Sequence, residues 1–252
     1  LPLTKRAKRR HCKLEKEVLE ASDAVLVVGD TMKRKFEQFS RSIHVLTNGF
    51  DTDKTSVDAS KEIVLDAKFT ITHVGLMNAD RNPYVFWRAL KEIADTNASF
   101  ASDYKVQLVG KIAPEVEDII SKLQLENVHE IGYVAHEEVK GYQARSQVLL
   151  LAVNNVKSAK GILTGKVFEY LQAKRPIVAV GPIDGDLAQI ITETNSGLMV
   201  DFDDVDAMKV ALLKMYDLFK DTGLRIDSKN IQQYHRKNIT KKLSEIIKMT
   251  IS

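Results

Sequence analysis

The chain has 252 residues, with 37 Lys and Arg against 34 Asp and Glu, a formal net charge of +3 and 44% hydrophobic residues. This composition is typical of a folded globular protein and excludes a low-complexity, collagen-like or disulfide-stapled chain. The single Cys12 cannot form an internal disulfide, which fits a reducing, cytoplasmic compartment. No apolar run approaches the roughly 18 residues of a membrane-spanning helix, and the start is too polar for a signal peptide. Because the chain opens on Leu1 rather than Met, we expect it to be a piece of a longer protein.

The two ends of the chain are basic and its middle is acidic. Residues 1–16 contain seven basic and one acidic side chain, and residues 225–252 contain seven and two. Such segments are either surfaces that meet anionic partners or solvated faces of helices. A nucleic-acid partner is disfavoured, because no aromatic side chains interleave the lysines and the central region is acidic. A peripheral contact of the first residues with anionic membrane lipids stays open.

Short apolar runs alternate with amphipathic segments along the chain. We expect strands over 24–28, 43–46, 69–74, 105–110, 128–134, 148–153, 176–181 and 197–202. We expect helices over 11–22, 31–39, 83–96, 114–124, 136–145, 165–174, 184–194, 204–220 and 228–250, and a polar loop over 51–62. Because parallel strands need crossover connections, this alternation predicts a doubly wound α/β fold, with a parallel sheet covered by helices on both faces.

Several well-known chemistries lack their sequence pattern here. The chain contains no GxGxxG dinucleotide fingerprint, no GxxxxGK[ST] phosphate loop and no GxSxG nucleophile. Its six histidines and one cysteine show no metal-ligand spacing, so no metal site is predicted. In doubly wound sheets, ligands bind beyond the carboxyl ends of the strands, which directs attention to the strand-end loops.

The first unusual loop follows the strand predicted over 69–74. Gly75 ends that strand, and Arg81 lies just before a helix that begins near Pro83. Glycine lets a ligand approach the backbone, a helix N-terminus favours an anion, and arginine adds a forked cation. The alternative is that Arg81 is an ordinary surface residue.

The second unusual loop follows the strand predicted over 148–153. Thr164 and Gly165 precede Lys166 at the start of a helix, where free backbone N–H groups and a lysine suit a diphosphate. Glu169 follows one turn later, and its carboxylate suits a pair of sugar hydroxyls. The sequence thus points to a ribose-diphosphate site, against the alternative of an exposed ion pair between Lys166 and Glu169.

The order of these motifs resembles the donor-binding half of a GT-B glycosyltransferase, similar to the glycosyltransferase group 1 / family 4 enzymes. The segments ASDAVLVVG (21–29) and IHVLTNGFD (43–51) are similar to the family's passage into its C-terminal domain. HVGLMNADRN (73–82) resembles its phosphate loop, and EIGYVAHEEVK (130–140) the strand and loop beside the nucleotide base. TGKVFEYLQAKRPIVAV (164–180) resembles the signature K-x-F-E-Y-L-A-x-G-K-P-I-V and is the most specific match.

The resemblance implies transfer of a glycosyl group from a nucleotide diphosphate sugar to an acceptor hydroxyl. It assigns Lys166 and Arg81 to the charge of the leaving diphosphate, with no metal expected, and Glu169 to the ribose hydroxyls. It places Gly75, Thr164 and Gly165 around the phosphates, and Gly132 and Val134 beside the base. Two positions depart from the family: Leu76 stands where it has an arginine, and Gly161 where it has the first of two glutamates.

The resemblance also implies that an N-terminal, acceptor-binding domain is absent from this chain. The expected division is a basic helical lead-in over 1–22, a Rossmann-like nucleotide-sugar-binding domain over 23–227, and a C-terminal helix over 228–252. That helix either crosses to the absent domain or covers its own sheet.

Alternatives remain for the function and for single residues. One is a non-catalytic nucleotide-sugar binding module, which Leu76 and Gly161 favour; another is a related nucleotide-sugar epimerase, which should show paired carboxylates and histidines. His73 is either a core histidine or a base. Asn154 and Lys157 are candidates for contact with the donor sugar. Asp184 and Asp186 are a cap-and-turn pair or part of the site.

Overall fold

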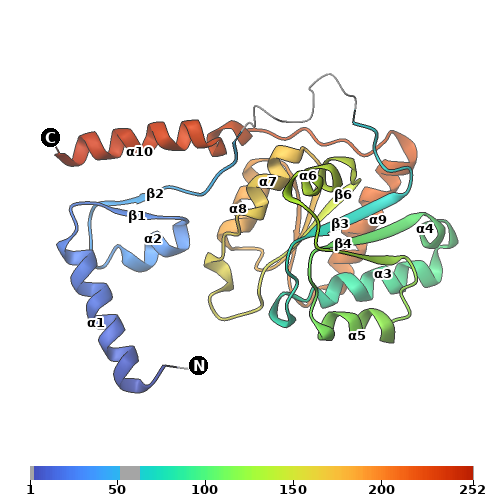
Figure 1. Ribbon diagram of the computed structural model, residues 1–252, viewed down its shortest axis with the longest axis horizontal. Helices are drawn as coiled ribbons and strands as arrows, with labels where there is room; N and C mark the ends of the chain where they lie inside the picture. The colour runs from blue at the N-terminus through green and yellow to red at the C-terminus, as the bar shows by residue number, and fades with distance from the viewer. Residues whose placement is uncertain (1–2, 52–62, 252) are drawn as a thin grey trace. The chain divides into compact units, whose positions relative to one another are not determined.

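The computed structural model describes residues 3–51 and 63–251. Apart from Asp51, the loop predicted over 51–62 lies outside the described residues. The chain divides into two compact units: unit 1 joins Leu1–Asp51 to Gln232–Ser252, and unit 2 is Thr52–Ile231. Figure 1 shows the elements of both units.

Unit 2 is built on a parallel sheet of six strands, in the order β5-β4-β3-β6-β7-β8. The strands are β3 (Phe69–Val74), β4 (Tyr104–Val109), β5 (Val128–Gly132), β6 (Val148–Ala152), β7 (Ile177–Val180) and β8 (Gly197–Val200). Numbered along the unit, this is the order 3-2-1-4-5-6 of doubly wound nucleotide-binding sheets. The predicted fold class is confirmed.

Helices cover both faces of the sheet. They are α3 (Tyr84–Thr96), α4 (Ala98–Asp103), α5 (Pro114–Lys122), α6 (His136–Arg145), α7 (Lys166–Ala173), α8 (Asp186–Glu193) and α9 (Val205–Asp221). Figure 1 shows α3, α5 and α9 on one face, where α3 packs against α9, and α6, α7 and α8 on the other. The short 3-10 turns η1 (Ala79–Arg81), η2 (Ala159–Gly161) and η3 (Ile231–Tyr234) lie in the connections.

Helix α4 was not expected from the sequence. It has six residues, too few for a helical period to show, and it forms because of a cap and an anchor. The side chain of Asn97 accepts a hydrogen bond from the N–H of Phe100 at 3.0 Å, and Phe100 is fully buried in the core. There Phe100 contacts the rings of Phe69 and Tyr216, so α4 is held by one aromatic side chain.

Arg175 fixes the connection between α7 and β7. Its Nε donates to the carbonyl of Ser146 at 2.7 Å, and its Nη2 donates to the carbonyls of Gln147 and Leu224, both at 3.1 Å. These acceptors come from the connection between α6 and β6 and from the segment after α9. The half-buried guanidinium of Arg175 thus holds three segments together next to β6 and α7, the two elements that the second predicted loop connects.

Unit 1 contains α1 (Lys5–Ala21), β1 (Val25–Val27), α2 (Asp30–Phe36), β2 (Ile43–Val45) and α10 (Arg236–Ile251). Strands β1 and β2 pair in parallel as a separate two-stranded sheet. The backbone of Phe50 exchanges hydrogen bonds with the carbonyl of Tyr234 and the N–H of Arg236, at 3.0 and 2.9 Å, which joins β2 to the start of α10.

The division into units differs from the one expected from sequence. We expected residues 23–227 to form one domain, whereas residues 23–51 group with α10 in unit 1. Most elements lie close to their expected positions, but α1 begins at Lys5 rather than at residue 11, and α10 begins at Arg236 rather than at residue 228, after the 3-10 turn η3. An apolar run indicates a strand but not the sheet to which it belongs, so the pattern could not assign β1 and β2.

Candidate functional site

The order of the strands in unit 2 reverses between β3 and β6. To one side of this point lie β4 and β5, and to the other side β7 and β8. In open α/β sheets, the crevice beyond the carboxyl ends of two such strands is where ligands bind. The loop after β3 contains Gly75 and Arg81, and the loop after β6 leads to Lys166. The fold therefore brings together the two loops that the sequence singled out.

Two buried side chains stand between β3 and β6 at this reversal. The middle of β3 pairs with the beginning of β6. Further along, the hydroxyl of Tyr170 accepts a hydrogen bond from the N–H of Val74 at 3.0 Å and donates one to the carbonyl of Leu150 at 3.3 Å. The Nδ1 of His73 lies 3.1 Å from the same carbonyl. Tyr170 and His73 are both fully buried. Tyr170, which sequence reasoning missed, belongs to the motif that begins at Lys166, and its position in that motif was the available signal.

His73 is a neutral histidine. Burial, followed by the nearby charges of Lys166 and Arg81, lowers its pKa to about 3. Its Nδ1 therefore carries the proton donated to Leu150, and its Nε2 has no hydrogen-bond partner among the described residues. Full burial and a bond to a strand carbonyl agree with the core role rather than the role of a base.

Lys166 lies against the backbone of Gly75. Gly75 has φ +100°, and a Cβ at this position would lie 2.7 Å from Cε and 2.8 Å from Nζ of Lys166. The ammonium is buried and has no hydrogen-bond acceptor among residues 3–51 and 63–251. Burial, followed by the charge of Arg81, lowers the pKa of Lys166 to about 8, while Glu169 acts in the opposite direction. A buried ammonium without an acceptor is unfavourable unless an anion joins it.

Arg81 is held by acceptors from two loops. It ends η1, and its Nε donates to Oδ1 of Asn154 at 2.8 Å while its Nη1 donates to the carbonyl of Leu76 at 3.0 Å. Beside this pair, the N–H of Asn155 donates to the carbonyl of Asp80 at 2.6 Å. The loops that follow β3 and β6 are thus joined by one side-chain bond and one backbone bond.

The N-terminus of α7 is open to a ligand. Gly165 precedes the helix with no side-chain cap, and a Cβ there would meet nothing within 4 Å. The hydroxyl of Thr164 lies 3.4 Å from the N–H of Lys166. Glu169 is exposed on the first turn, and one of its oxygens accepts the amide of Gln143 at 3.2 Å. The N–H groups of Lys166, Val167 and Phe168 are bonded within this first turn, so what the helix start offers an anion is the positive end of its dipole.

Glycines with positive φ end the three neighbouring strands β3, β4 and β5. Gly75, Gly110 and Gly132 have φ values of +100°, +125° and +75°. A Cβ at Gly110 would lie 2.8 Å from the carbonyl oxygen of Gly75, and the N–H of Gly110 donates to the carbonyl of Gly132 at 2.7 Å. Gly132 and the half-buried Val134 lie two strands from β3, about 10 Å at the usual strand spacing. Gly110 was not predicted, although a glycine that ends an apolar strand was visible in the sequence.

The two departures from the family pattern lie on the same loops. Leu76 is half exposed, so no cation takes the place of the family arginine at that position. Gly161 ends η2, whose Lys160 forms an ion pair with Asp184 at 2.5 Å. Asp184 is therefore occupied by a partner in the turn after β7, while Lys157 is exposed in the loop after β6.

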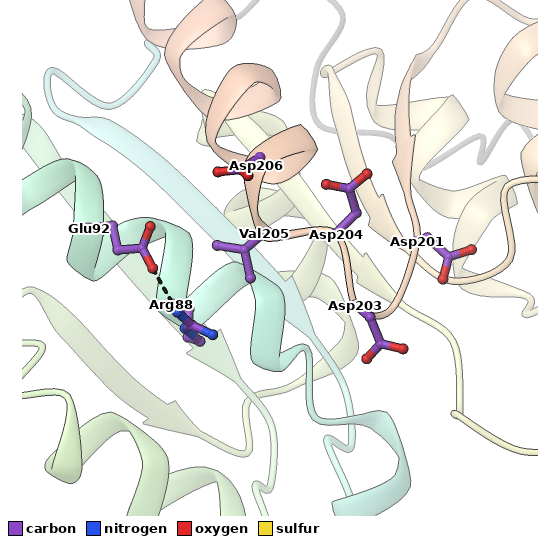
Figure 2. A pocket seen from close by; sticks show the side chains of 7 residues that line it. All are labelled: Arg88, Glu92, Asp201, Asp203, Asp204, Val205 and Asp206. Atoms are coloured by element: carbon purple, nitrogen blue, oxygen red, sulfur yellow. Dashed lines mark hydrogen bonds and ion pairs between the residues drawn. The ribbon is translucent and has the colours of Figure 1, made fainter.

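An acidic pocket is lined by none of the residues predicted for the switch-point site. Figure 2 shows it between α3 and the loop from β8 to α9, with a volume of about 570 Å³. It is lined by Arg88, Glu92, Asp201, Asp203, Asp204, Val205 and Asp206. Its carboxylates disfavour a phosphate. Among the described residues no group of three or more His, Cys, Asp or Glu side chains is arranged to hold a metal ion, and no helix is long and apolar enough to cross a membrane.

Similar folds occur in several solved structures. The chain matches sucrose-phosphate synthase from Thermosynechococcus elongatus with a TM-score of 0.70 and 15% identity, over 99% of this chain and 64% of that one. It matches WaaG, a glycosyltransferase of lipopolysaccharide biosynthesis, with a TM-score of 0.66 and 16% identity over 94% and 67%. It matches S. aureus TarM with a TM-score of 0.61 and 14% identity over 93% and 46%. The chain thus spans about two thirds or less of these proteins, and no match was found among curated protein sequences.

The sequence match covers the whole predicted site. The family model for group 1 glycosyl transferases matches residues 68–217, more than half of the chain, and this range contains both switch-point loops and the row of glycines. The parallel sheet of unit 2 is the Rossmann-like half of a GT-B fold. The chain therefore belongs to the group 1 glycosyl transferases.

Proposed function

We propose that unit 2 binds the diphosphate of a nucleotide-sugar donor at the switch point, for transfer of a hexosyl group to an acceptor hydroxyl. The observation that carries this proposal is the ammonium of Lys166, which is buried against Gly75 without an acceptor among the described residues. An anion bound there supplies the missing partner, and the positive end of the α7 dipole, where Lys166 stands, favours the same anion.

Each predicted residue has a role in this proposal. Lys166 and Arg81 stabilise the charge that develops on the leaving diphosphate, and electrostatic stabilisation of this kind usually contributes most to the rate enhancement. Thr164 and Gly165 lie at the start of α7, where the positive end of the helix dipole favours the phosphates. Glu169 is exposed and accepts hydrogen bonds from two ribose hydroxyls. Because these cations act on the leaving group, we propose that transfer needs no bound metal ion.

The row of glycines extends the proposed site along the sheet edge. Gly75 lets the phosphates approach the backbone, because no side chain fills the space beside Lys166. The backbone of Gly132 and Val134 flanks the base. The nucleotide base is then held by backbone groups two strands away from the diphosphate, so this end of the site needs no charged side chain.

Calorimetry of the chain against UDP, GDP, ADP and dTDP in EDTA tests the donor site. We expect one of these nucleotides to bind, and Lys166→Ala and Glu169→Ala each to weaken it at least tenfold, the effect of a lost hydrogen bond to a charged group. Lys122→Ala is the matched control, because this exposed lysine lies at the end of α5. Absence of binding to all four, or binding unaffected by both site substitutions, contradicts the proposal.

A second candidate is a nucleotide-sugar binding module without catalysis. The observation that favours it is the pair of departures: the exposed Leu76 leaves the diphosphate one cation short, and Gly161 offers no carboxylate to the sugar. The two candidates differ in turnover. A protein that includes the acceptor domain and binds the nucleotide sugar without consuming it would support the module.

We also propose that an N-terminal, acceptor-binding domain completes the enzyme, so that this chain alone is insufficient for catalysis. The solved structures that it matches are longer, and unit 1 has only a two-stranded parallel sheet among its described residues, below what is stable alone. Apolar side chains on its helices are exposed, namely Leu14, Val18, Ile247, Met249 and Ile251. Extension of the chain at its N-terminus should restore transfer and slow hydrogen exchange in α10; unchanged exchange would contradict this.

The basic start of α1 supports a further proposal, a peripheral contact with anionic lipids on the cytoplasmic side. Lys5, Arg6, Lys8, Arg9 and Arg10 are all exposed. Polybasic segments of this kind gain roughly 1 kcal/mol per residue near an anionic surface. The exposed free thiol of Cys12 suits a reducing compartment. Sedimentation with anionic liposomes, with and without residues 1–16, tests the contact, and equal sedimentation of the two chains would contradict it.

A further inference from the structure

Arg81 is oriented by a residue on the other side of the switch point. Asn154 is the second residue after β6, it is half-buried, and its Oδ1 accepts the Nε–H of Arg81 at 2.8 Å. The carbonyl of Leu76 accepts a second hydrogen bond from Nη1 at 3.0 Å. A guanidinium has five N–H groups in a fixed plane, so two acceptors at its Nε and Nη1 determine the direction of the others.

We propose that Asn154 is a positioning residue that presents the guanidinium of Arg81 to the diphosphate of the donor. This proposal rests on the proposed function of the same site. Sequence reasoning left Asn154 as a candidate for contact with the donor sugar, but its side-chain oxygen already serves Arg81. Asn154 therefore acts on the cation of Arg81 rather than on the sugar.

A neutral acceptor suits this task. The oxygen of an asparagine holds Nε in place without cancelling the positive charge, whereas a carboxylate would hold it and neutralise it. The charge matters here because Leu76 contributes none, which leaves Arg81 and Lys166 as the cations next to the strand end at Gly75. A long side chain that is already held loses less freedom when it binds an anion.

The backbone allows the role of this side chain to be tested separately. The N–H of the next residue, Asn155, donates to the carbonyl of Asp80 at 2.6 Å, so the two loops stay joined when the side chain of Asn154 is removed. Asn155 itself is exposed. Asn155→Ala keeps this backbone bond and is therefore the matched control for Asn154→Ala.

The experiment is a double-mutant cycle on nucleotide binding. Affinity for the best-bound member of UDP, GDP, ADP and dTDP is measured for the wild type, Asn154→Ala, Arg81→Ala and the double variant. We expect Asn154→Ala to weaken binding about tenfold when Arg81 is present. It should have no effect in the Arg81→Ala background, because Asn154 acts on the nucleotide only through Arg81. Asn154→Asp should weaken binding as well, since it neutralises Arg81, and Asn155→Ala should not.

Two different results would overturn the proposal. An equal loss of affinity from Asn154→Ala with and without Arg81 would show an independent contact. A loss seen with the nucleotide sugar but not with the nucleotide alone would return Asn154 to the sugar. In both cases the wild type still binds the nucleotide, and the proposed function stands. If the wild type binds none of the four nucleotides, the proposed function fails, and the role of Asn154 fails with it.

Discussion

Replacement of Lys166 by methionine should stabilise the free protein and abolish nucleotide binding. Methionine keeps an unbranched apolar side chain next to Gly75 and removes the buried ammonium, which has no acceptor among the described residues. In a part of the structure that served only stability, loss of a buried polar partner would destabilise the fold. Here the opposite sign is expected, because the ammonium is unpaired until an anion arrives.

The size of the effect follows from the pKa of Lys166, which burial lowers from 10.5 to about 8. Below pH 8 the amine is charged in both the folded and the unfolded chain, and the folded state carries the full cost of the buried charge. Each pKa unit corresponds to about 1.4 kcal/mol, so the free energy of unfolding of Lys166→Met should exceed that of the wild type by up to about 3 kcal/mol at pH 7. Between pH 8 and 10.5 the unfolded chain binds more protons than the folded one, so the wild type gains stability and the difference shrinks.

Urea unfolding of both proteins without nucleotide, at pH 7 and pH 10, measures this difference. Groups other than Lys166 titrate in both proteins and cancel in the comparison. Lys122→Met is the control, because this lysine is exposed at the end of α5 and its replacement should change stability by less than about 0.5 kcal/mol. A Lys166→Met protein that is less stable than the wild type at pH 7, or a difference that does not fall with pH, would refute the reasoning.

Three further predictions use the same site. Nucleotide affinity of the wild type should fall as pH rises above about 8, because Lys166 of the nucleotide-free protein loses its proton there. Isothermal titration in buffers of different ionisation enthalpy should report proton uptake on binding near pH 8. An affinity that is constant to pH 10 would contradict this prediction. Gly75→Ala should weaken nucleotide binding at least tenfold, because its Cβ displaces the ammonium, whereas Gly223→Ala, at a similar positive φ with nothing within 4 Å, should leave affinity unchanged. Tyr170→Phe should lower the free energy of unfolding by about 1–3 kcal/mol, because the buried N–H of Val74 loses its acceptor. Tyr133→Phe is the control and should have no effect, since Tyr133 is 95% exposed. Equal urea midpoints for Tyr170→Phe and the wild type would count against the bridging role of Tyr170.

The fold of unit 2 could be predicted because apolar and polar residues alternate along its sequence with a clear strand or helix period. Strands such as β3 and β6 are apolar runs, and helices such as α3 have one apolar face, so local pattern and global fold agree there. The pattern is weaker in β5, which contains His129 and Glu130, and in α6, whose buried residue is Gln143. The division of the chain could not be predicted in the same way. Strands β1 and β2 have the same apolar character as the strands of unit 2, and what separates them is a pairing partner, which a local pattern does not encode.

The candidate site could be anticipated where residue type alone suggests the chemistry. Lys166, Arg81 and Gly75 were visible because a cation or a strand-end glycine is unusual in its segment, and the strand order brings them to one place. Tyr170 and Asn154 were harder to interpret, because each acts through one atom on a neighbour from another part of the chain. The hydroxyl of Tyr170 bridges β3 and β6, and the oxygen of Asn154 orients Arg81, which only the packed fold reveals.

The net charge of the chain says little about its anionic partner, and the pairing of individual lysines says more. Lys209 and Lys220 on α9 each lie within 3.0 Å of a carboxylate, from Glu92 and Asp103 respectively, so their charges are cancelled locally. Lys166 differs from them because its ammonium is buried and has no acceptor in the described part of the chain. Unit 2 can therefore be acidic in sum, with an acidic pocket at α3, and still attract a diphosphate at the switch point, because carboxylates largely cancel the charges of the paired lysines nearby but not the charge of Lys166.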